Sequence, residues 1–376
     1  MTIKMAIEMI IRFRSLGGAL AFCAAVFWPS AAPTQTTVLP KACVACHGSE
    51  AQYPVRGART QYLTSGHRTI GNASYANADD CQACHTNEGF IQKVKTGKVE
   101  VKKFVANPSE IGCVTCHAPH EKGDFSLRTA SPVVLANGAV FDRGSGNLCA
   151  NCHRARRTPK EEVRARAIPS ASWGPHHGPQ ADMLQGTNGY EFPGRKYSSS
   201  AHAGLPGAQC VTCHMAQPAG RYSLSPAIGG HSFKVEGEVH GAPKLNAAGC
   251  LSSGCHGEMK QVPGTLSFDR RAPADYDGDG RTEPIQDEIQ GLYERLINDR
   301  GAGLLQTMKD APYDARGRFV NSKTQYPLEV VAALYNYKFV QEDRSRGIHN
   351  STYAVQLLMD SIKALDKSFD DSTRPR

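Results

Sequence analysis

Twelve of the thirteen cysteines in this 376-residue chain fall into six pairs, and a histidine directly follows the second cysteine of every pair. Two residues separate the cysteines in five of the pairs, and four residues separate them in the sixth. The pairs and their histidines are Cys43, Cys46 and His47; Cys81, Cys84 and His85; Cys113, Cys116 and His117; Cys149, Cys152 and His153; Cys210, Cys213 and His214; and Cys250, Cys255 and His256. A disulfide framework gives no reason for the histidines, so the pattern excludes an ordinary disulfide-rich fold.

Cys-x-x-Cys-His is the attachment sequence of c-type haem. The two thiols form thioethers with the porphyrin, and the histidine then supplies one axial ligand to the iron. The alternative, zinc, takes four ligands from two such pairs and does not explain a histidine after every second cysteine. We therefore predict six covalently bound haem c groups. In the longer sixth motif, Cys250 to His256, the insert must bulge, and a disulfide or a zinc site is the alternative there.

The composition also indicates that something other than protein fills the interior. Only 40% of the residues are hydrophobic and 7% are aromatic, whereas the chain has 36 Gly and 22 Pro. The segments between motifs are too short to form independent domains, so the haems must pack close together and supply apolar surface. We predict a mainly α fold with extensive loops and little or no sheet, in which residues 33–265 form a hexahaem-binding region.

Eight histidines remain after the six in the motifs, and six irons need a second axial ligand. Those assigned as distal ligands are His67, His120, His176, His202, His231 and His349. His120 is too close to His117 to bind the same iron, so it should serve a neighbouring haem. Side chains of adjacent residues diverge, so only one of His176 and His177 is expected to bind, and little separates them. His240 is the other spare histidine.

The N-terminus has the features of a secretory signal. Three basic residues, Lys4, Arg12 and Arg14, precede an apolar stretch at residues 16–28, and small residues follow it. The alternative, a membrane anchor, requires a longer apolar run. We predict that residues 1–32 are a signal peptide and that the protein is exported to the periplasm or the cell surface.

A short acidic segment reproduces the first half of a calcium-binding loop. Asp275, Asp277 and Asp279 occupy ligand positions 1, 3 and 5, and Gly280 allows the sharp turn at position 6. Position 12, normally Glu, is Gln286. The segment therefore predicts a structural calcium site, and an ordinary acidic turn is the alternative.

Helical periodicity appears only after this loop. The apolar faces are Ile285, Ile289, Leu292, Leu296 and Ile297; Val331, Leu334, Tyr335 and Phe339; and Leu358, Ile362, Leu365 and Phe369. Residues 266–376 should thus comprise the calcium-loop-like segment and a brace of C-terminal helices. His349 precedes the last helix, from which it would reach the haem region.

The formal net charge of +8 does not indicate a nucleic-acid partner. Six haems carry twelve propionates, whose negative charge would offset that of the polypeptide. The basic residues between Arg154 and Arg166 are accordingly interpreted as a solvated surface that also pairs with propionates.

The six motifs, the segment at residues 174–182, the Asp-Gly-Asp-Gly loop and Gly347-Ile-His-Asn resemble those of exported multihaem c-type cytochromes. That family includes periplasmic electron shuttles, outer-surface cytochromes that polymerise into filaments, and ammonia-forming nitrite reductase. The nitrite reductase typically has a Cys-x-x-Cys-Lys motif at its active haem, whereas all six motifs here end in histidine. The hydroxylamine-oxidising and tetrathionate-reducing relatives resemble octahaem proteins, and this chain has two motifs fewer.

Three functions are compatible with these observations. The first is an electron carrier in which two histidines bind every iron, and it is favoured because eight further histidines are available for six places. A reductase for a nitrogen or sulfur oxyanion would instead keep one iron open, and His256 would be the first candidate. A filament subunit would continue its haem chain across a polymer interface, as a homo-oligomer. Each requires redox partners, which include other cytochromes, quinol-linked membrane complexes and extracellular acceptors.

Overall fold

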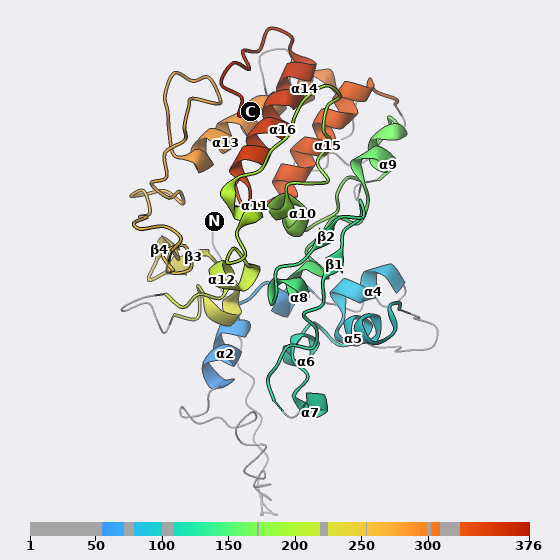
Figure 1. Ribbon diagram of the computed structural model, residues 1–376, viewed down its shortest axis with the longest axis vertical. Helices are drawn as coiled ribbons and strands as arrows, with labels where there is room; N and C mark the ends of the chain where they lie inside the picture. Colours follow the sequence, from blue (N-terminus) through green and yellow to red (C-terminus); the bar gives the residue numbers. More distant parts are fainter. Residues whose placement is uncertain are drawn as a thin grey trace, which may run out of the picture.

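The structure is a computed structural model that describes residues 55–70, 79–99, 108–122, 124–170, 173–218, 225–252, 254–298, 302–308 and 324–376. The described chain consists mostly of helices and loops, and its strands form two small two-stranded sheets (Figure 1). This confirms the predicted mainly α fold with little sheet. The predicted signal peptide, residues 1–32, lies outside the described residues.

Short elements make up the first part of the chain. The helices are α2 (Val55–Tyr62), α3 (His67–Ile70), α4 (Asp79–His85), α5 (Asn87–Thr96), α6 (Cys113–Cys116), α7 (Pro119–Lys122), α8 (Gly146–Ala150), α9 (Pro159–Arg164), α10 (Gln180–Gln185), α11 (Ala201–Gly204), α12 (Cys210–His214) and the 3-10 helix η4 (Gly230–Ser232). The strands are β1 (Val133–Val134), β2 (Val140–Phe141), β3 (Glu236–Val239) and β4 (Ala242–Leu245). Both sheets are antiparallel hairpins, with Val133 opposite Phe141 and Glu236 opposite Leu245.

Four longer or later helices, α13 (Ile285–Asn298), α14 (Leu304–Thr307), α15 (Leu328–Asp343) and α16 (Ser351–Leu365), form the C-terminal brace. The brace occupies the upper part of Figure 1, and the helices that carry cysteine motifs lie below it. α15 and α16 pack against each other, and α13 packs on α16. In the described residues, no helix has the length and apolar character needed to cross a membrane.

Most residues of the predicted apolar faces of the brace are buried, Ile285, Ile297 and Leu365 are partly buried, and α15 is not amphipathic. Val331, Leu334, Tyr335 and Phe339 have no exposed surface, and neither do Ala332 and Ala333 on other sides of the helix. α15 is enclosed because α9 and α10 also pack against it. The last predicted face is also shorter than expected, because α16 ends at Leu365 and Phe369 reaches the core from the loop beyond it.

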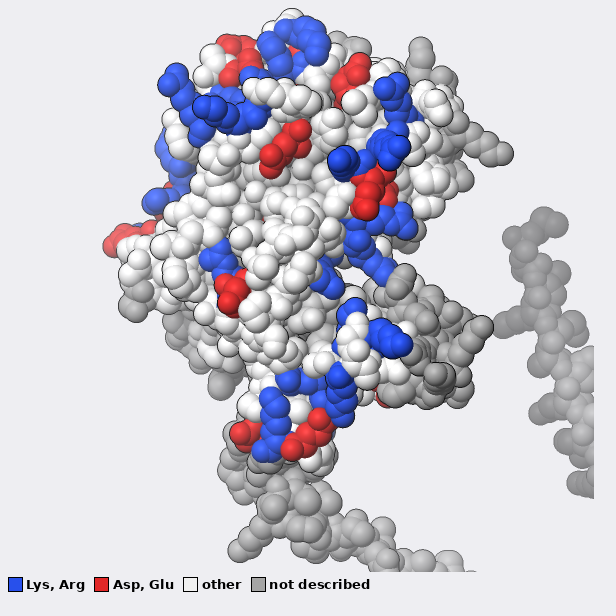
Figure 2. All heavy atoms as spheres, turned by 45° about the vertical axis from the view of Figure 1, so that its right-hand side comes forward, with Lys and Arg blue, Asp and Glu red and all other residues white. Residues whose placement is uncertain are grey.

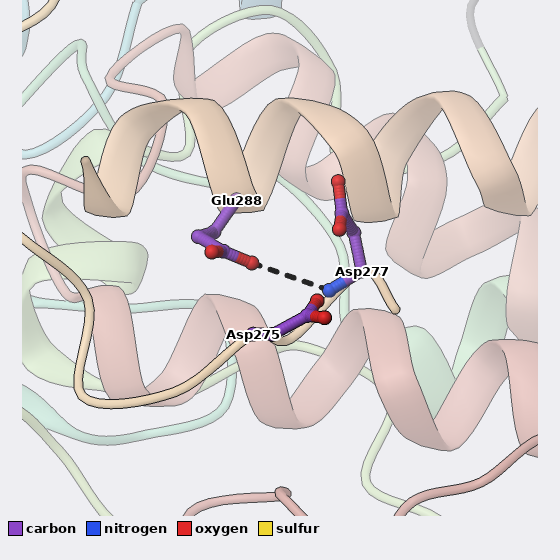
Figure 3. Close-up of side chains that lie close together, drawn as sticks. All are labelled: Asp275, Asp277 and Glu288. Atoms are coloured by element: carbon purple, nitrogen blue, oxygen red, sulfur yellow. Dashed lines mark hydrogen bonds between the residues drawn. The ribbon is translucent and has the colours of Figure 1, made fainter. Parts of the chain in front are cut away.

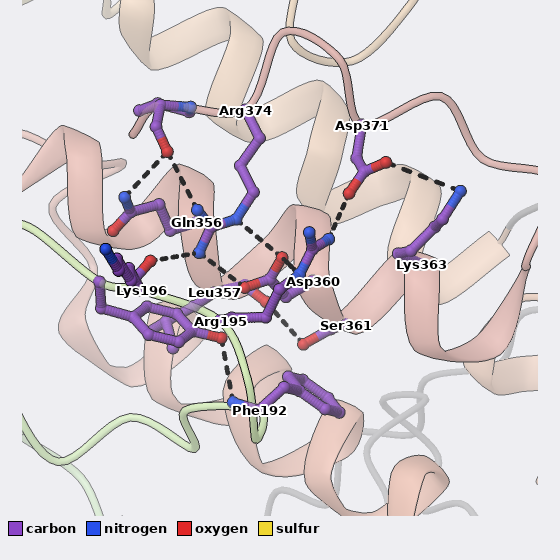
Figure 4. A network of polar contacts seen from close by, with 12 residues as sticks. Phe192, Arg195, Lys196, Gln356, Leu357, Asp360, Ser361, Lys363, Asp371 and Arg374 are labelled. Atoms are coloured by element: carbon purple, nitrogen blue, oxygen red, sulfur yellow. Dashed lines mark hydrogen bonds and ion pairs between the residues drawn. The ribbon is translucent and has the colours of Figure 1, made fainter.

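A buried carboxylate ties the C-terminal segment to α16 (Figure 4). Asp360 is almost completely buried and accepts two hydrogen bonds of 2.8 Å from the guanidinium of Arg374. Arg195, from the segment before α11, contacts the same carboxylate at 3.0 Å and also pairs with Asp371. The network thus joins α16 and the C-terminal segment to Arg195, which is far from both in sequence.

Replacing Asp360 with Ala should lower the free energy of unfolding by about 3 kcal/mol, because it leaves buried Arg374 without its counter-charge. Denaturant titration of the purified protein, followed by far-ultraviolet circular dichroism, measures this change. The matched control is Asp370→Ala, which removes an exposed carboxylate from the same segment. Equal effects of the two substitutions would contradict this role for the network.

Candidate functional site

The cysteine motifs of the described chain surround one continuous cavity of about 2460 Å³. This is larger than an ordinary small-molecule site of ~300–1,000 Å³, so the cavity can accommodate more than one large ligand. Its walls include cysteines and histidines of the second to sixth motifs. The residues of the first motif, Cys43, Cys46 and His47, lie outside the described residues.

A common backbone hydrogen bond closes the motifs. The His117 amide donates to the carbonyl of Cys113 at 2.9 Å, and the His153 amide donates to that of Cys149 at the same distance. In the longer sixth motif the His256 amide still donates to the carbonyl of Cys250, at 3.1 Å. Gly254 permits this closure, because its φ of 83° is a left-handed conformation that glycine adopts without steric cost. The sixth histidine therefore returns to the same backbone position despite the insert.

Neighbouring motifs contact each other through their thiols. Cys84 lies beside Cys152, Cys149 beside Cys210, and Cys213 beside Cys250. The last of these contacts depends on close backbone approach: a Cβ atom on Gly249 would lie 2.3 Å from the Thr212 carbonyl oxygen. Groups attached to these cysteines would consequently be adjacent.

The motif histidines of the described chain lie opposite histidines from other segments. Each pair joins one motif histidine to one of the predicted distal ligands. The ring centroids are separated by 5.9 Å in His67–His153, 6.4 Å in His85–His176, 6.2 Å in His117–His231, 6.0 Å in His202–His256 and 6.2 Å in His214–His349. Two imidazoles that bind one metal from opposite sides, with bonds of about 2 Å, have centroids roughly 6 Å apart. The spacing fits an iron between each pair.

The other three histidines within the described residues have different surroundings. His120 lies on α7 and lines the cavity. His177 also borders the cavity, and its Nδ1 atom lies 2.9 Å from the carboxylate of Glu342. His240 and Gly241 form the turn between β3 and β4, with φ of 54° and 74°, the conformation of a tight type I′ hairpin.

Hydrogen bonds orient several of the paired rings. The Nδ1 atoms of His117, His202 and His214 lie 2.7 Å, 2.7 Å and 2.9 Å from backbone carbonyl oxygens, and that of His153 lies 3.1 Å from the side-chain oxygen of Gln180. A ring that donates from Nδ1 presents Nε2 to a metal.

Burial keeps most of these imidazoles neutral, which is the form that binds metals. It lowers the pKa of His67 and of His176 to about 4, assisted by neighbouring histidines and, for His176, by Arg156. The same cause lowers the pKa values of His153, His214, His231 and His256.

His349 differs because its Nδ1 atom lies 2.6 Å from the carboxylate of Asp343. Burial opposes the charged form of His349, but the Asp343 carboxylate outweighs burial and raises the pKa of the ring. The turn between them contains Arg344 and Arg346 with positive φ angles of 60° and 48°. Such left-handed residues cost about 1–2 kcal/mol each, so the surrounding structure must hold this turn. Arg346 does so by donating to the carbonyl of Leu266.

The charge of the cavity wall fits a cofactor with acidic groups. Nine basic side chains line the cavity, against four acidic ones. The basic residues are Arg59, Lys93, Lys98, Arg154, Arg156, Lys234, Arg270, Arg344 and Arg346. On the face shown in Figure 2, Lys and Arg side chains extend from the upper to the lower end, with acidic side chains among them. Together with the histidine spacing, this wall suits haem and its propionates.

The acidic loop brings together carboxylates from two elements (Figure 3). Oxygen atoms of Asp275, Asp277 and Glu288 lie within 4.8 Å of one another, as do those of Asp277, Asp279 and Glu283. Burial and the neighbouring carboxylates raise the pKa of Asp277 to about 6. Glu288, on α13, also accepts hydrogen bonds from the amides of Tyr276 and Glu283. Glu288 was not among the predicted ligands, because it lies two residues beyond the expected position 12.

Two further residues at the site were not predicted from the sequence. Gln180 and Asp343 contact imidazole Nδ1 atoms, and neither belongs to a motif. Gln180 lies in the Gly174–Asp182 segment, which resembles a segment of multihaem c-type cytochromes, so the sequence contained a weak indication of its role. No feature of the sequence indicated Asp343, because its contact with His349 depends on the turn that follows α15.

Comparisons with known proteins add two similar structures. No protein-family description and no curated protein sequence matches the chain. The crystal structure of the outer cell wall cytochrome OcwA is 22% identical, with a TM-score of 0.41, over 81% of this chain and 50% of that one. The undecahaem cytochrome from the S-layer of Carboxydothermus ferrireducens is 19% identical, with a TM-score of 0.41, over 85% of this chain and 41% of that one. The chain thus spans half or less of each similar protein.

A pH-dependent contribution should come from Asp182, which lies beside the fourth motif. Its carboxylate accepts from the Ala155 amide at 2.6 Å, and burial raises its pKa from 3.8 to about 6. The folded protein therefore keeps this proton where the unfolded chain has lost it. Through this group, the free energy of unfolding should fall by about 3 kcal/mol as the pH rises from 3.8 to about 6.

Denaturant titrations at several pH values, compared between the wild type and Asp182→Asn, measure this contribution. The variant should lose that part of the pH dependence. An identical pH dependence in both proteins would show that Asp182 titrates normally in the folded state.

Proposed function

We propose that the chain is a hexahaem c-type cytochrome that carries electrons. The single observation that supports this most strongly is the spacing of roughly 6 Å between five motif histidines and five distal histidines. In this proposal the cysteines of each motif hold one haem, and the paired histidines bind its iron from both sides. The haems would supply one-electron couples between ferric and ferrous iron.

The first motif completes the set. Five of the six predicted distal histidines already have a motif histidine opposite them, and His120 is the sixth. We assign His120 to the haem of His47, which agrees with its place on the cavity wall.

Two histidines on every iron leave no coordination position for a substrate. The protein's own residues then have three tasks: to hold the haems, to keep the imidazoles neutral by burial, and to place cations near the propionates. These tasks support a carrier rather than a reductase. The donor and acceptor would be other redox proteins, quinol-linked membrane complexes or extracellular acceptors, with no role for nucleic acid.

We also propose that the protein is exported and acts in respiratory electron transfer in the periplasm or at the cell surface. The signal-like residues 1–32 and the haem motifs support export. The two similar structures come from an outer cell wall cytochrome and an S-layer cytochrome, which agrees with a surface location.

All six irons should be six-coordinate and low-spin. Mass spectrometry should show six haems on the purified protein, and carbon monoxide added to the reduced protein should leave its optical spectrum unchanged. His202→Gly should convert one haem to a high-spin form that binds carbon monoxide, whereas His240→Gly serves as the matched control. If carbon monoxide changed the optical spectrum of one haem in the unmodified protein, that result would instead favour the reductase, with one open iron.

Structural calcium is proposed at Asp275, Asp277 and Asp279, with Glu288 in place of the missing position-12 ligand. Clustered carboxylates repel one another, and Ca²⁺ prefers oxygen ligands of this kind. Chelation should therefore lower the denaturation temperature of the protein, and added Ca²⁺ should restore it.

Asp277→Asn should remove this response, because it takes away a charge while keeping the shape of the side chain. Glu294→Gln, on the exposed side of α13, should retain it. If chelation has no effect on the wild type, the segment is an ordinary acidic turn.

A further inference from the structure

We propose that Asp343 lowers the reduction potential of the haem bound between His214 and His349. This inference rests on the proposed function, because it takes those two histidines as axial ligands. Asp343 does not touch the haem in this proposal; it acts as a positioning and tuning residue through His349.

The contact between the two side chains is short and enclosed. Asp343 Oδ1 lies 2.6 Å from His349 Nδ1, and the exposed fractions of the side chains are 1% and 19%. The other carboxylate oxygen accepts hydrogen bonds from the amide and the hydroxyl of Ser345. The same hydroxyl accepts from the His349 amide at 3.2 Å, so Ser345 links both residues of the pair.

Helix stability does not explain an aspartate at this position. Asp343 is the last residue of α15, where the partial negative charge of the helix dipole disfavours a carboxylate. Burial disfavours a carboxylate further unless a specific partner compensates for it. His349 is the partner that the turn with Arg344 and Arg346 brings into place.

The charge on the acceptor separates this imidazole from other proposed ligands. His117, His202 and His214 face backbone carbonyls, and His153 faces the amide of Gln180, all of which are neutral. A carboxylate that accepts from Nδ1 makes the imidazole a more basic metal ligand than a neutral acceptor does. A more basic ligand and a nearby negative charge both favour ferric over ferrous iron.

The affected haem would occupy an interior place in the row of motifs. α12, which carries the fifth motif, packs on α8 of the fourth motif, and Gly249, next to the sixth motif, closely approaches the backbone of Cys213. A lower reduction potential at this haem would set the difference in potential between it and the haem on either side.

Spectroelectrochemical titration of the holoprotein tests the inference. In Asp343→Asn, one of the six one-electron transitions should move to higher potential. The equilibrium constant for reduction of that haem should rise by a factor of about ten, which corresponds to a shift of 59 mV for one electron. Glu342→Gln is the matched control: it removes the neighbouring carboxylate, which contacts His177 instead. That control should move every transition by less, because Glu342 does not accept a hydrogen bond from a proposed axial ligand.

A second variant covers the case in which Asp343→Asn fails to fold. Ser345→Ala removes a hydrogen bond to the carboxylate and leaves more negative charge facing His349. It should move the same transition in the opposite direction, to lower potential. If all six transitions keep their potentials in every variant that folds, the inference is wrong.

The spin state separates this result from failure of the proposed function. If His349→Gly produces one high-spin haem but Asp343→Asn moves no potential, the ligand assignment holds and the tuning role is excluded. If His349→Gly leaves every haem low-spin, His349 is not a ligand, and both the assignment and the tuning role fall.

Discussion

Each iron in the proposed cytochrome needs two histidines, and the haem motif supplies only one of them. The second must therefore come from another part of the chain, as His349 would for His214 and His202 would for His256. Around the motifs the protein has a modest core of its own, formed by residues such as Val133, Leu135 and Phe141. Ligand pairs between distant segments would then stabilise the folded protein, as buried apolar contacts do in an ordinary domain.

The brace provides what the motif region lacks. α15 is buried along residues 330–336, and its C-terminal end and the turn after it present Asp343, Ile348 and His349 to the cavity. The Ile348 carbonyl orients His202, and His349 lies opposite His214. Two histidine pairs are thus positioned by one turn, which explains why it tolerates left-handed residues.

The sequence was sufficient to predict the fold class, and it also named the histidines that the structure places in pairs, because fixed spacing and a count of histidines carry that information. It could not assign partners, since the approach of His67 to His153 depends on tertiary structure. The enclosure of α15 was missed for a similar reason: periodicity predicts one buried face, whereas packing by α9 and α10 covers the others. Asp343 was missed because it reaches His349 across a turn, and Glu288 was missed because it lies two residues beyond the expected position 12 of the loop.

The network around Asp360 has a consequence for biogenesis. Arg374 and Gln356 hold residues 196–198, which lie between the fourth and fifth motifs, through hydrogen bonds to Lys196 and Ser198. A chain that crosses a membrane from its N-terminus delivers Arg374 after every cysteine. If the protein is exported and binds haem as proposed, the brace would close onto residues 196–198 only after all the thiols have emerged, so the thiols would still be accessible when haem is attached.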